Sequence, residues 1–342
     1  LSKGIGISKE QLSEDGEPCI LYGELYTKYK SEIIKQVESK TDINGSKLKR
    51  SKANDVIIPC SGETAVDIAT ARCVPFDNIL FGGDLNVISL HQYDGAFMSY
   101  QLNGKRKYDI ARVAQGVSIV HLYGEHLKAI KTYNPTLPEQ QKIAKLLSLL
   151  DDRIDTQNKI IEKLQSLIKG IAQHCIKEST SGNTYVKLGD ICQITTGKLD
   201  ANAQVDNGIY PFFTCAEQPF KIDSFAFDTE ALLISGNGAN LGYINYYKGK
   251  FNAYQRTYVL DLFSENIQYI KWALKVLLPK RIAIEKSSSN TPYIVLSTLT
   301  DLRLPIPCKS KQSFIANLMQ SLERKLSNQI AQYDSYNYLK QY

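Results

Sequence analysis

The sequence has no uninterrupted run of about 18 apolar residues, the length that a membrane-spanning helix needs. Residues 1–4 lead into polar sequence and not into the apolar segment of a signal peptide, so we expect a cytoplasmic protein with no membrane partner. The seven cysteines are odd in number and scattered, without a Cys-x-x-Cys pair or a histidine at zinc-ligand spacing. They are therefore expected to be reduced thiols, and no metal site is expected.

Catalytic motifs are also lacking. A methyltransferase acting on the amino groups of DNA needs an Asn/Asp-Pro-Pro-aromatic loop, and the nearest segment, Asn134-Pro135-Thr136, lacks the second proline and the aromatic residue. A metal-dependent nuclease needs clustered carboxylates near a lysine, and Glu38-Ser39-Lys40 has no counterpart in the second half of the chain. We therefore expect no catalysis and no cofactor in this chain.

The composition is that of a folded protein. Apolar residues make up 43% of the 342 residues and charged residues 22%, which excludes a disordered chain and suggests two or three domains. The net charge of +6 is mild: it permits binding to a polyanion without establishing it.

The chain contains an internal repeat at one constant offset. Residues 143–151 (IAKLLSLLD) align with residues 315–323 (IANLMQSLE), and Pro135 aligns with Pro307. Further upstream the register drifts: Ser61-Gly62 resembles Ser235-Gly236, and residues 118–120 resemble residues 293–295. The predicted order is therefore domain, long helix, domain, long helix.

The repeat is incomplete at both ends. The segment that opens the second copy, residues 187–194, has no counterpart before Leu1, and Tyr342 aligns with Gly170 inside the first helix. We therefore expect an incomplete first domain and a shortened second helix.

Residues 139–173 carry apolar side chains spaced by threes and fours, which predicts one continuous amphipathic helix of roughly 50 Å. Thr136 and Glu139 form a predicted capping box, and Pro138 is tolerated in the first turn. A helix of this length outruns its domain, so we favour two antiparallel helices that cover each other's apolar stripes. The residues predicted to pack between the helices are Ile143, Leu146, Leu150, Ile154, Ile161, Leu164, Ile168, Ile315, Leu318, Leu322 and Leu326.

Each globular half is predicted to mix strands and helices. In the first half the expected strands are residues 56–59, 79–81 and 87–90, and in the second they are residues 231–234, 241–247 and 254–262. Residues 94–102 and 266–278 are predicted to be helical, with the second helix ending at Pro279.

The glycine-rich segment at residues 235–242 (SGNGANLG) invites comparison with a nucleotide-binding loop. We reject this interpretation because the glycine spacing is wrong and a strand, not a helix, is predicted to follow. A hairpin whose glycines permit close backbone approach is the preferred interpretation.

Basic residues cluster in both halves near polar loops, an arrangement suited to phosphate and base contacts, although any single cluster is explained as well by a solvated surface. The candidate DNA-binding residues are Lys47, Lys49, Arg50, Lys52, Ser61, Arg72, Lys105, Arg106, Lys107, Lys198, Asn237, Asn240, Arg256, Lys280, Arg281, Ser288 and Asn290.

Two motifs identify a family resemblance. Residues 135–144 (PTLPEQQKIA) run into residues 149–154 (LLDDRI), and the second copy opens with residues 187–191 (KLGDI) followed by residues 195–198 (TTGK). With these motifs the chain resembles the specificity subunit of type I restriction-modification systems over nearly its whole length.

The resemblance implies an α+β fold in which two mixed target recognition domains are separated by two long antiparallel coiled-coil helices. The implied segments are a first domain at 1–134, a first helix at 135–178, a second domain at 185–306 and a second helix at 307–342. It also implies a non-catalytic subunit that reads a split site in double-stranded DNA and docks two modification subunits. S-adenosylmethionine would bind in those modification subunits, and restriction subunits are a further implied partner.

The alternative is a non-catalytic coiled-coil scaffold or ligand-binding protein with duplicated domains. An enzyme fused to its own recognition domain is disfavoured by the missing motifs.

Overall fold

The computed structural model describes residues 1–179, 184–288 and 293–341. Its tertiary contacts form two compact units, each with its own domain. Unit 1 comprises Leu1–Asn158 and Gln332–Tyr342, and unit 2 comprises Lys159–Ala331.

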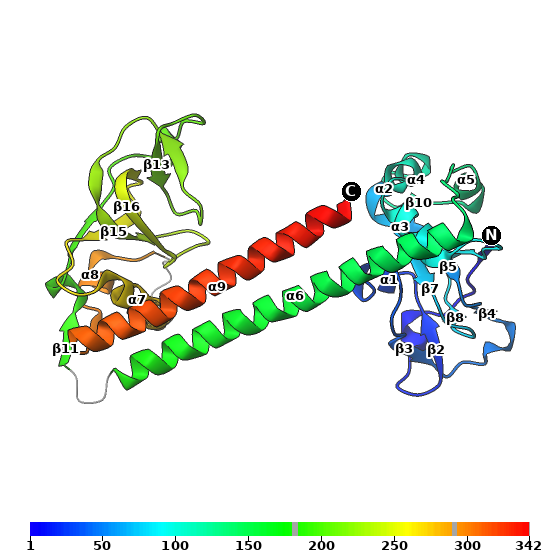
Figure 1. Ribbon diagram of the computed structural model, residues 1–342, viewed down its shortest axis with the longest axis horizontal. Helices are drawn as coiled ribbons and strands as arrows, with labels where there is room; N and C mark the ends of the chain where they lie inside the picture. Colours follow the sequence, from blue (N-terminus) through cyan, green and yellow to red (C-terminus); the bar gives the residue numbers. More distant parts are fainter. Residues whose placement is uncertain (180–183, 289–292, 342) are drawn as a thin grey trace. The chain divides into compact units, whose positions relative to one another are not determined.

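Two long helices, α6 (Leu137–Glu178) and α9 (Lys309–Gln341), contribute residues to both units (Figure 1). They run antiparallel. In unit 2 the Lys311 Nζ donates to the Glu178 carbonyl at 3.1 Å, and in unit 1 the Lys340 Nζ lies 2.7 Å from an Asp151 carboxylate oxygen. The two predicted long helices and their antiparallel pairing are therefore confirmed; α6 extends past the apolar stripe at residues 139–173 and lies within the implied segment 135–178.

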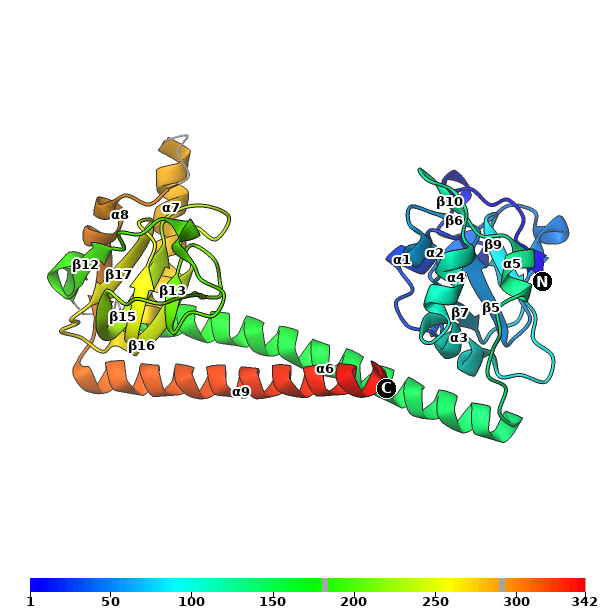
Figure 2. The ribbon, with the colours of Figure 1, turned by 90° about the horizontal axis from the view of Figure 1, so that it is seen from above.

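Unit 2 is built on a six-stranded sheet in the order β12-β17-β15-β16-β13-β14 (Figure 2). Its strands are β12 (Gln193–Thr196), β13 (Tyr210–Phe213), β14 (Phe220–Ile222), β15 (Phe227–Ser235), β16 (Ile244–Ala253) and β17 (Thr257–Asp261). A separate pair joins β11 (Thr184–Lys187) to β18 (Arg303–Ile306). Both faces of β15 are buried, because Leu232 belongs to one hydrophobic cluster and its neighbour Leu233 to another. This explains why the apolar run in the strand is continuous and does not alternate.

Unit 1 repeats this topology with the long strand interrupted. Its strands are β1 (Ser2–Lys3), β2 (Glu17–Ile20), β3 (Ser39–Thr41), β4 (Lys49–Arg50), β5 (Asp55–Pro59), β6 (Ser61–Gly62), β7 (Arg72–Val74), β8 (Leu80–Phe81), β9 (Leu85–Ile88) and β10 (Val120–His121). β2 pairs in parallel with β8 (Cys19 with Leu80), just as β13 pairs in parallel with the end of β16. β7 and β8 thus correspond to the two ends of β16, and Pro75 follows β7 where the strand breaks.

The main helices of the two domains differ in continuity. Unit 1 has α3 (Gly95–Asn103) and α4 (Lys107–Val113), which are separated at Gly104, whereas unit 2 has one helix, α7 (Ile267–Ser288). The prediction that this helix ends at Pro279 was wrong. Leu278 is fully buried and Ile282 packs on the same cluster, so packing on both sides of the proline outweighs its cost of about 3 kcal/mol.

Short helical turns complete the domains. They are α1 (Glu24–Thr27), α2 (Ala65–Ile68), α5 (Gly124–Lys128), α8 (Leu296–Thr300) and 3-10 turns at Lys9–Gln11, Gly45–Lys47, Leu188–Asp190 and Ala201–Ala203.

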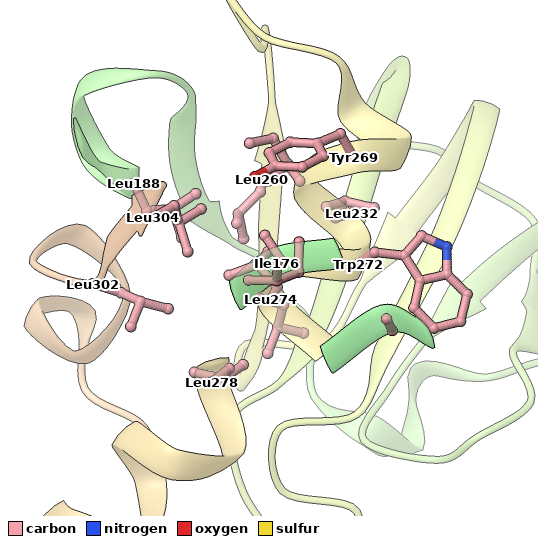
Figure 3. Packing of buried hydrophobic residues seen from close by; sticks show 14 of the residues in the cluster. Ile176, Leu188, Leu232, Leu260, Tyr269, Trp272, Leu274, Leu278, Leu302 and Leu304 are labelled. Atoms are coloured by element: carbon pink, nitrogen blue, oxygen red, sulfur yellow. The ribbon is translucent and has the colours of Figure 1, made fainter. Parts of the chain in front are cut away.

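The long helices enter the core of unit 2. Figure 3 shows Ile176 of α6 among Leu232 and Leu260 of the sheet and Leu274 of α7. The same cluster contains further residues of both long helices: Leu164, Ile168, Ala172, Ile315 and Met319, with Leu322 and Leu326 packed against it. In this unit the predicted stripe is buried at Ile161, Leu164, Ile168 and Ile315, and it is half-buried at Leu318, Leu322 and Leu326.

In unit 1 the stripe is largely exposed. Ile143 is 40% exposed and Leu146 is 61% exposed, while Ala144 and Asp151 on the same helix are buried. The prediction that Ile143 and Leu146 pack between the helices was therefore wrong for this chain. Leu150 and Ile154 are half-buried.

A buried glutamine locks the start of each long helix to its domain. The Gln140 side chain accepts from the Asp94 backbone N–H at 2.9 Å and donates to the Pro135 carbonyl at 2.9 Å. Gln312 aligns with Gln140 in the repeat; its side chain accepts from the Asn266 N–H at 3.0 Å and donates to the Pro307 carbonyl at 2.9 Å. Both glutamines are 1% exposed. Gln140, the first glutamine of the motif at residues 135–144, therefore orients α6 with respect to the N-terminus of α3.

Candidate nucleic-acid interface

The glycine-rich segment of the second domain is a hairpin loop, as predicted. It connects β15 to β16 and is closed by the Gly242 N–H, which donates to the Ser235 carbonyl at 2.8 Å. A Cβ added at Gly236 would lie 2.4 Å from the Arg256 carbonyl oxygen, so the close approach requires glycine.

Two further segments contact this loop at the same end of the sheet, and a third contacts the turn at residues 254–256. The Gly236 N–H donates to the Arg256 carbonyl at 2.8 Å, and the Gln255 N–H donates to the Leu199 carbonyl at 2.9 Å. The Asn240 side chain donates to the Cys215 carbonyl at 3.0 Å. Four of the candidate residues therefore gather here: Lys198, Asn237, Asn240 and Arg256.

Arg256 and Lys198 are exposed, and neither side chain makes an ion pair or hydrogen bond within the part of the chain that the structure describes. Arg256 closes a three-residue connection between β16 and β17. Its guanidinium is available to an external acceptor.

The first domain has the same arrangement at the connection between β8 and β9. The Cys60 N–H donates to the Asp84 carbonyl at 2.7 Å, where Gly236 donates to Arg256 in the second domain. The Leu122 N–H donates to the Cys60 carbonyl at 2.8 Å, and the Ile294 N–H donates to the Gly236 carbonyl at 2.8 Å. Cys60 is thus equivalent to Gly236, and Asp84 is equivalent to Arg256.

These contacts correct the sequence alignment at two places. Ser61 pairs with His121 across β6 and β10, and Asn237 forms a β-bridge with Tyr293. Ser61 therefore corresponds to Asn237, and not to Ser235. His121 corresponds to Tyr293. The loops differ in length, so matching the Ser-Gly pairs placed Ser61 opposite the wrong residue.

An open cleft of about 1050 Å³ lies beside this turn in the first domain. Its lining includes Tyr22, Tyr26, Ser61, Glu63, Asp67, Arg72, Asp84, Ser118 and His121. The Tyr26 hydroxyl donates to the Ser61 carbonyl at 3.2 Å, and the Ser61 hydroxyl donates to the Asp84 carboxylate at 3.1 Å. Burial raises the pKa of the neighbouring Cys60 thiol to about 11, so this cysteine stays protonated at neutral pH.

Asp84 and His121 were missed as candidates from the sequence. The signal was present, because the offset of the repeat aligns Asp84 with Arg256 and His121 with Tyr293. Neither residue is a lysine or an arginine, so the expectation of positive charge at a DNA surface did not identify them.

Arg72 supports the fold of the first domain. Its guanidinium donates to the carbonyls of Tyr29 at 2.7 Å and Ala71 at 2.9 Å. Burial lowers its pKa from the ordinary arginine value, with nearby carboxylates opposing the shift. A third hydrogen bond, to the Leu25 carbonyl at 3.5 Å, connects Arg72 to α1, so the guanidinium supports the fold while it also lines the cleft.

The basic clusters of the first domain divide into paired and available groups. Arg50 forms a bidentate ion pair with Glu17, at 2.6 and 3.0 Å. Arg106 lies 3.1 Å from Asp109 and its guanidinium carbon lies 4.7 Å from the centre of the Tyr133 ring. The remaining members are Lys47, Lys52 and Lys105, which are exposed, and Lys49 and Lys107, which are half-buried.

The basic group of the second domain lies inside α7 and not in a loop after it. Lys280 is exposed, and Arg281 pairs with Glu285 one turn later at 2.7 Å. Asn290 lies outside the described residues, as does the side chain of Ser288.

The described residues contain no group of three or more His, Cys, Asp or Glu side chains placed to hold a metal ion. The seven cysteines are free thiols, of which Cys308 is exposed. None of the helices in the described ranges is long and apolar enough to cross a membrane.

A family model described as "Type I restriction modification DNA specificity domain" matches the chain twice, at residues 8–166 and 180–333. The two matches follow the duplication seen in the fold.

Curated relatives carry related names. The chain is 44% identical over 137 residues to the type I restriction enzyme EcoDI specificity subunit of Escherichia coli, covering 40% of this chain and 30% of the relative. It is 25% identical over 256 residues to the type I restriction enzyme MjaIX specificity subunit of Methanocaldococcus jannaschii, covering 63% of this chain and 59% of the relative. The chain thus spans less than two thirds of the length of these relatives.

Solved structures share the fold. The S subunit of a type I restriction-modification system from M. genitalium superposes with a TM-score of 0.68 at 19% identity, covering 99% of this chain and 90% of that chain. A chain from a study of complex assembly and conformational transition of the type I R-M system gives a TM-score of 0.51 at 16% identity, covering 91% and 86%.

Proposed function

This chain belongs to the family of type I restriction modification DNA specificity domains, and from that premise we propose that it is the DNA sequence-recognition subunit of a type I restriction-modification complex. Its two domains each read one half of a split site in double-stranded DNA. The observation that carries the proposal is the matched pair of turns, each bringing exposed polar side chains to the same end of its domain.

The residues at this end suit the two kinds of DNA contact. Asn237, Asn240 and Arg256 offer donors and acceptors for base edges, and the exposed Lys198 beside them offers charge for a phosphate. The other exposed lysines of the candidate list, Lys47, Lys52, Lys105 and Lys280, are proposed phosphate contacts.

The proposed partners follow from the family. We propose that two modification subunits dock on this chain, bind S-adenosylmethionine and carry out methylation, while this chain contributes no catalytic group. Restriction subunits are a further proposed partner, and the proposed location is the cytoplasm, where the DNA is. The relatives' names as specificity subunits of restriction enzymes support this assignment.

Selection of bound sites from random duplex DNA tests the proposal. The purified chain is used alone and together with modification subunits, at low salt. We expect enrichment of two short motifs at one constant spacing. Absence of any motif under both conditions would overturn DNA specificity.

The salt dependence of binding distinguishes the proposed DNA-recognition subunit from the alternative, a scaffold or ligand-binding protein. Counterion release should make the affinity for selected DNA fall steeply as salt rises. An affinity that hardly changes with salt would favour the alternative.

A further inference from the structure

The equivalent turns of the two domains present side chains of opposite hydrogen-bonding character. Residues 82–84 connect β8 to β9, and residues 254–256 connect β16 to β17, aligned by the same offset of the repeat. Each turn begins with the same contact: the Gly82 N–H donates to the Ile20 carbonyl at 2.9 Å, and the Tyr254 N–H donates to the Phe213 carbonyl at 2.9 Å. The third residue is Asp84 in one turn and Arg256 in the other.

Both side chains are exposed, and contacts with the described residues leave part of their hydrogen-bonding capacity unused. Asp84 is held in the left-handed region, at φ 57°, and only one of its carboxylate oxygens accepts from the Ser61 hydroxyl. The ionised carboxylate is an acceptor only, whereas the Arg256 guanidinium is a donor only.

A phosphate is an unsuitable partner for this position. Domains of one fold that bind DNA in one way place equivalent turns against equivalent parts of the duplex. A phosphate opposite Arg256 would imply a phosphate opposite Asp84, where two negative charges repel each other. Glu63 and Asp67 line the same cleft as Asp84 and add to that repulsion, which the charge of Arg72 in the same lining offsets only in part.

A base edge is a suitable partner for both side chains. In the major groove guanine presents two acceptors, O6 and N7, which match the fork of an arginine. Adenine and cytosine present exocyclic amino groups, which match a carboxylate acceptor.

We infer that the third residue of this turn is a specificity-determining position in both domains, with Arg256 reading a guanine in one half-site and Asp84 reading the amino group of an adenine or cytosine in the other. The inference rests on the proposed function, since it requires that the domains bind DNA.

The test compares sites selected by the wild-type chain with sites selected by Arg256→Gln and Asp84→Gly. Glutamine pairs with adenine, so Arg256→Gln should replace the guanine preference at one position of one half-site and leave the other half-site unchanged. Glycine tolerates the positive φ, so Asp84→Gly should lose one preference in the other half-site without straining the turn. Each lost preference should amount to roughly 5- to 150-fold.

Arg303→Gln is the matched control, because Arg303 is an exposed arginine on β18, outside the cluster of loops at this end of the sheet. It should change neither half-site. A uniform loss of affinity in Arg256→Gln, with every base preference retained, would indicate a phosphate contact and overturn the inference. A wild-type chain that selects no motif would instead overturn the proposed function itself.

Discussion

In unit 2 the long helices are part of the main hydrophobic core, whereas in unit 1 they are held to the domain largely by polar and charged contacts. Ile168 of α6 is buried in the large cluster of unit 2. The position that the repeat aligns with Ile168 is Lys340 of α9, which in unit 1 lies 2.7 Å from Asp151 and 2.9 Å from Glu32. No residue of α6 or α9 joins the hydrophobic clusters found in the described part of unit 1.

The difference shows that one repeated stripe can serve two kinds of attachment. An apolar attachment depends on area buried, and an ionic one depends on each partner remaining in place, because a buried charge without its partner is costly. Tyr100 extends the ionic attachment by donating from its hydroxyl to Asp151 at 2.5 Å. The corresponding residue in unit 2 is Trp272, whose ring lies 4.3 Å from the Lys275 ammonium.

The largest expected effect on stability comes from weakening the apolar attachment of α6 to the core of unit 2. Ile168 is 6% exposed, so Ile168→Ala should lower the free energy of unfolding by about 2–5 kcal/mol through lost burial and a cavity. Urea unfolding followed by circular dichroism measures the change. A loss below about 0.5 kcal/mol, the range of surface substitutions, would show that the helix does not depend on this core.

Removal of the ionic attachment should have a somewhat smaller effect. Lys340→Met leaves Asp151 and Glu32 without their cation and should cost up to about 3 kcal/mol, limited by the 28% exposure of the lysine side chain. Unfolding of the two proteins at neutral pH measures the difference. Equal stability would indicate that the ion network contributes nothing.

The ionic attachment also predicts a pH dependence. Burial opposes the charge on Lys340, but its hydrogen bonds and attraction to Asp151 and Glu32 prevail, so its pKa is raised above the ordinary lysine value. The stabilisation is therefore complete below the unfolded pKa of about 10.4 and is lost as the pH rises through the higher folded pKa. The difference between wild type and Lys340→Met should stay constant from pH 7 to about pH 9 and shrink above about pH 10.4. A difference that changes already between pH 6 and 8 would contradict this assignment.

Gln140 and Gln312 allow a closer comparison of the two units, because they are equally buried but have different hydrogen-bond partners. Gln312 also donates to the Glu265 carboxylate at 2.6 Å, a contact for which no counterpart is seen at Gln140 in the described residues. Gln312→Ala and Gln140→Ala should each cost about 1–3 kcal/mol, with the larger loss at Gln312. Thermal unfolding of both variants checks the order, and a larger loss at Gln140 would refute it.

The smallest effect is expected at the exposed part of the stripe. Leu146 is 61% exposed, so Leu146→Ala should change the free energy of unfolding by less than about 0.5 kcal/mol. It is the matched control for Ile168→Ala on the same helix. A loss comparable to that of Ile168→Ala would mean that Leu146 is covered in solution by another surface.

The repeat and the long helices were predictable because the apolar spacing of α6 and α9 recurs at one offset and outlasts any single domain. The path of α7 through Pro279 was not predictable, because the deciding contribution is the packing of Leu278 and Ile282 against a core assembled from distant segments. The exposure of Leu146 was also hidden, since periodicity shows which face is apolar but not what covers it.

The sequence identified residues that the fold brings together, but their contacts with DNA stay a prediction. Lys198, Asn237, Asn240 and Arg256 come together from separate loops, and polar residues beside turns suggested them. Arg72 was chosen for its charge, but its side chain is half-buried and its guanidinium donates to backbone carbonyls of the same domain. Asp84 was not among the candidates because positive charge was expected at a DNA surface, and its proposed role follows from its place in the repeat.

The most direct test of split-site recognition measures the affinity of the chain for its selected duplex at one salt concentration. That duplex is compared with one in which either half-site is scrambled and with one in which the spacing between the half-sites is altered. Scrambling either half or changing the spacing should each weaken binding by at least about tenfold, since each mismatched base pair typically costs about 1–3 kcal/mol. Unchanged affinity after one half-site is scrambled would contradict recognition by two domains.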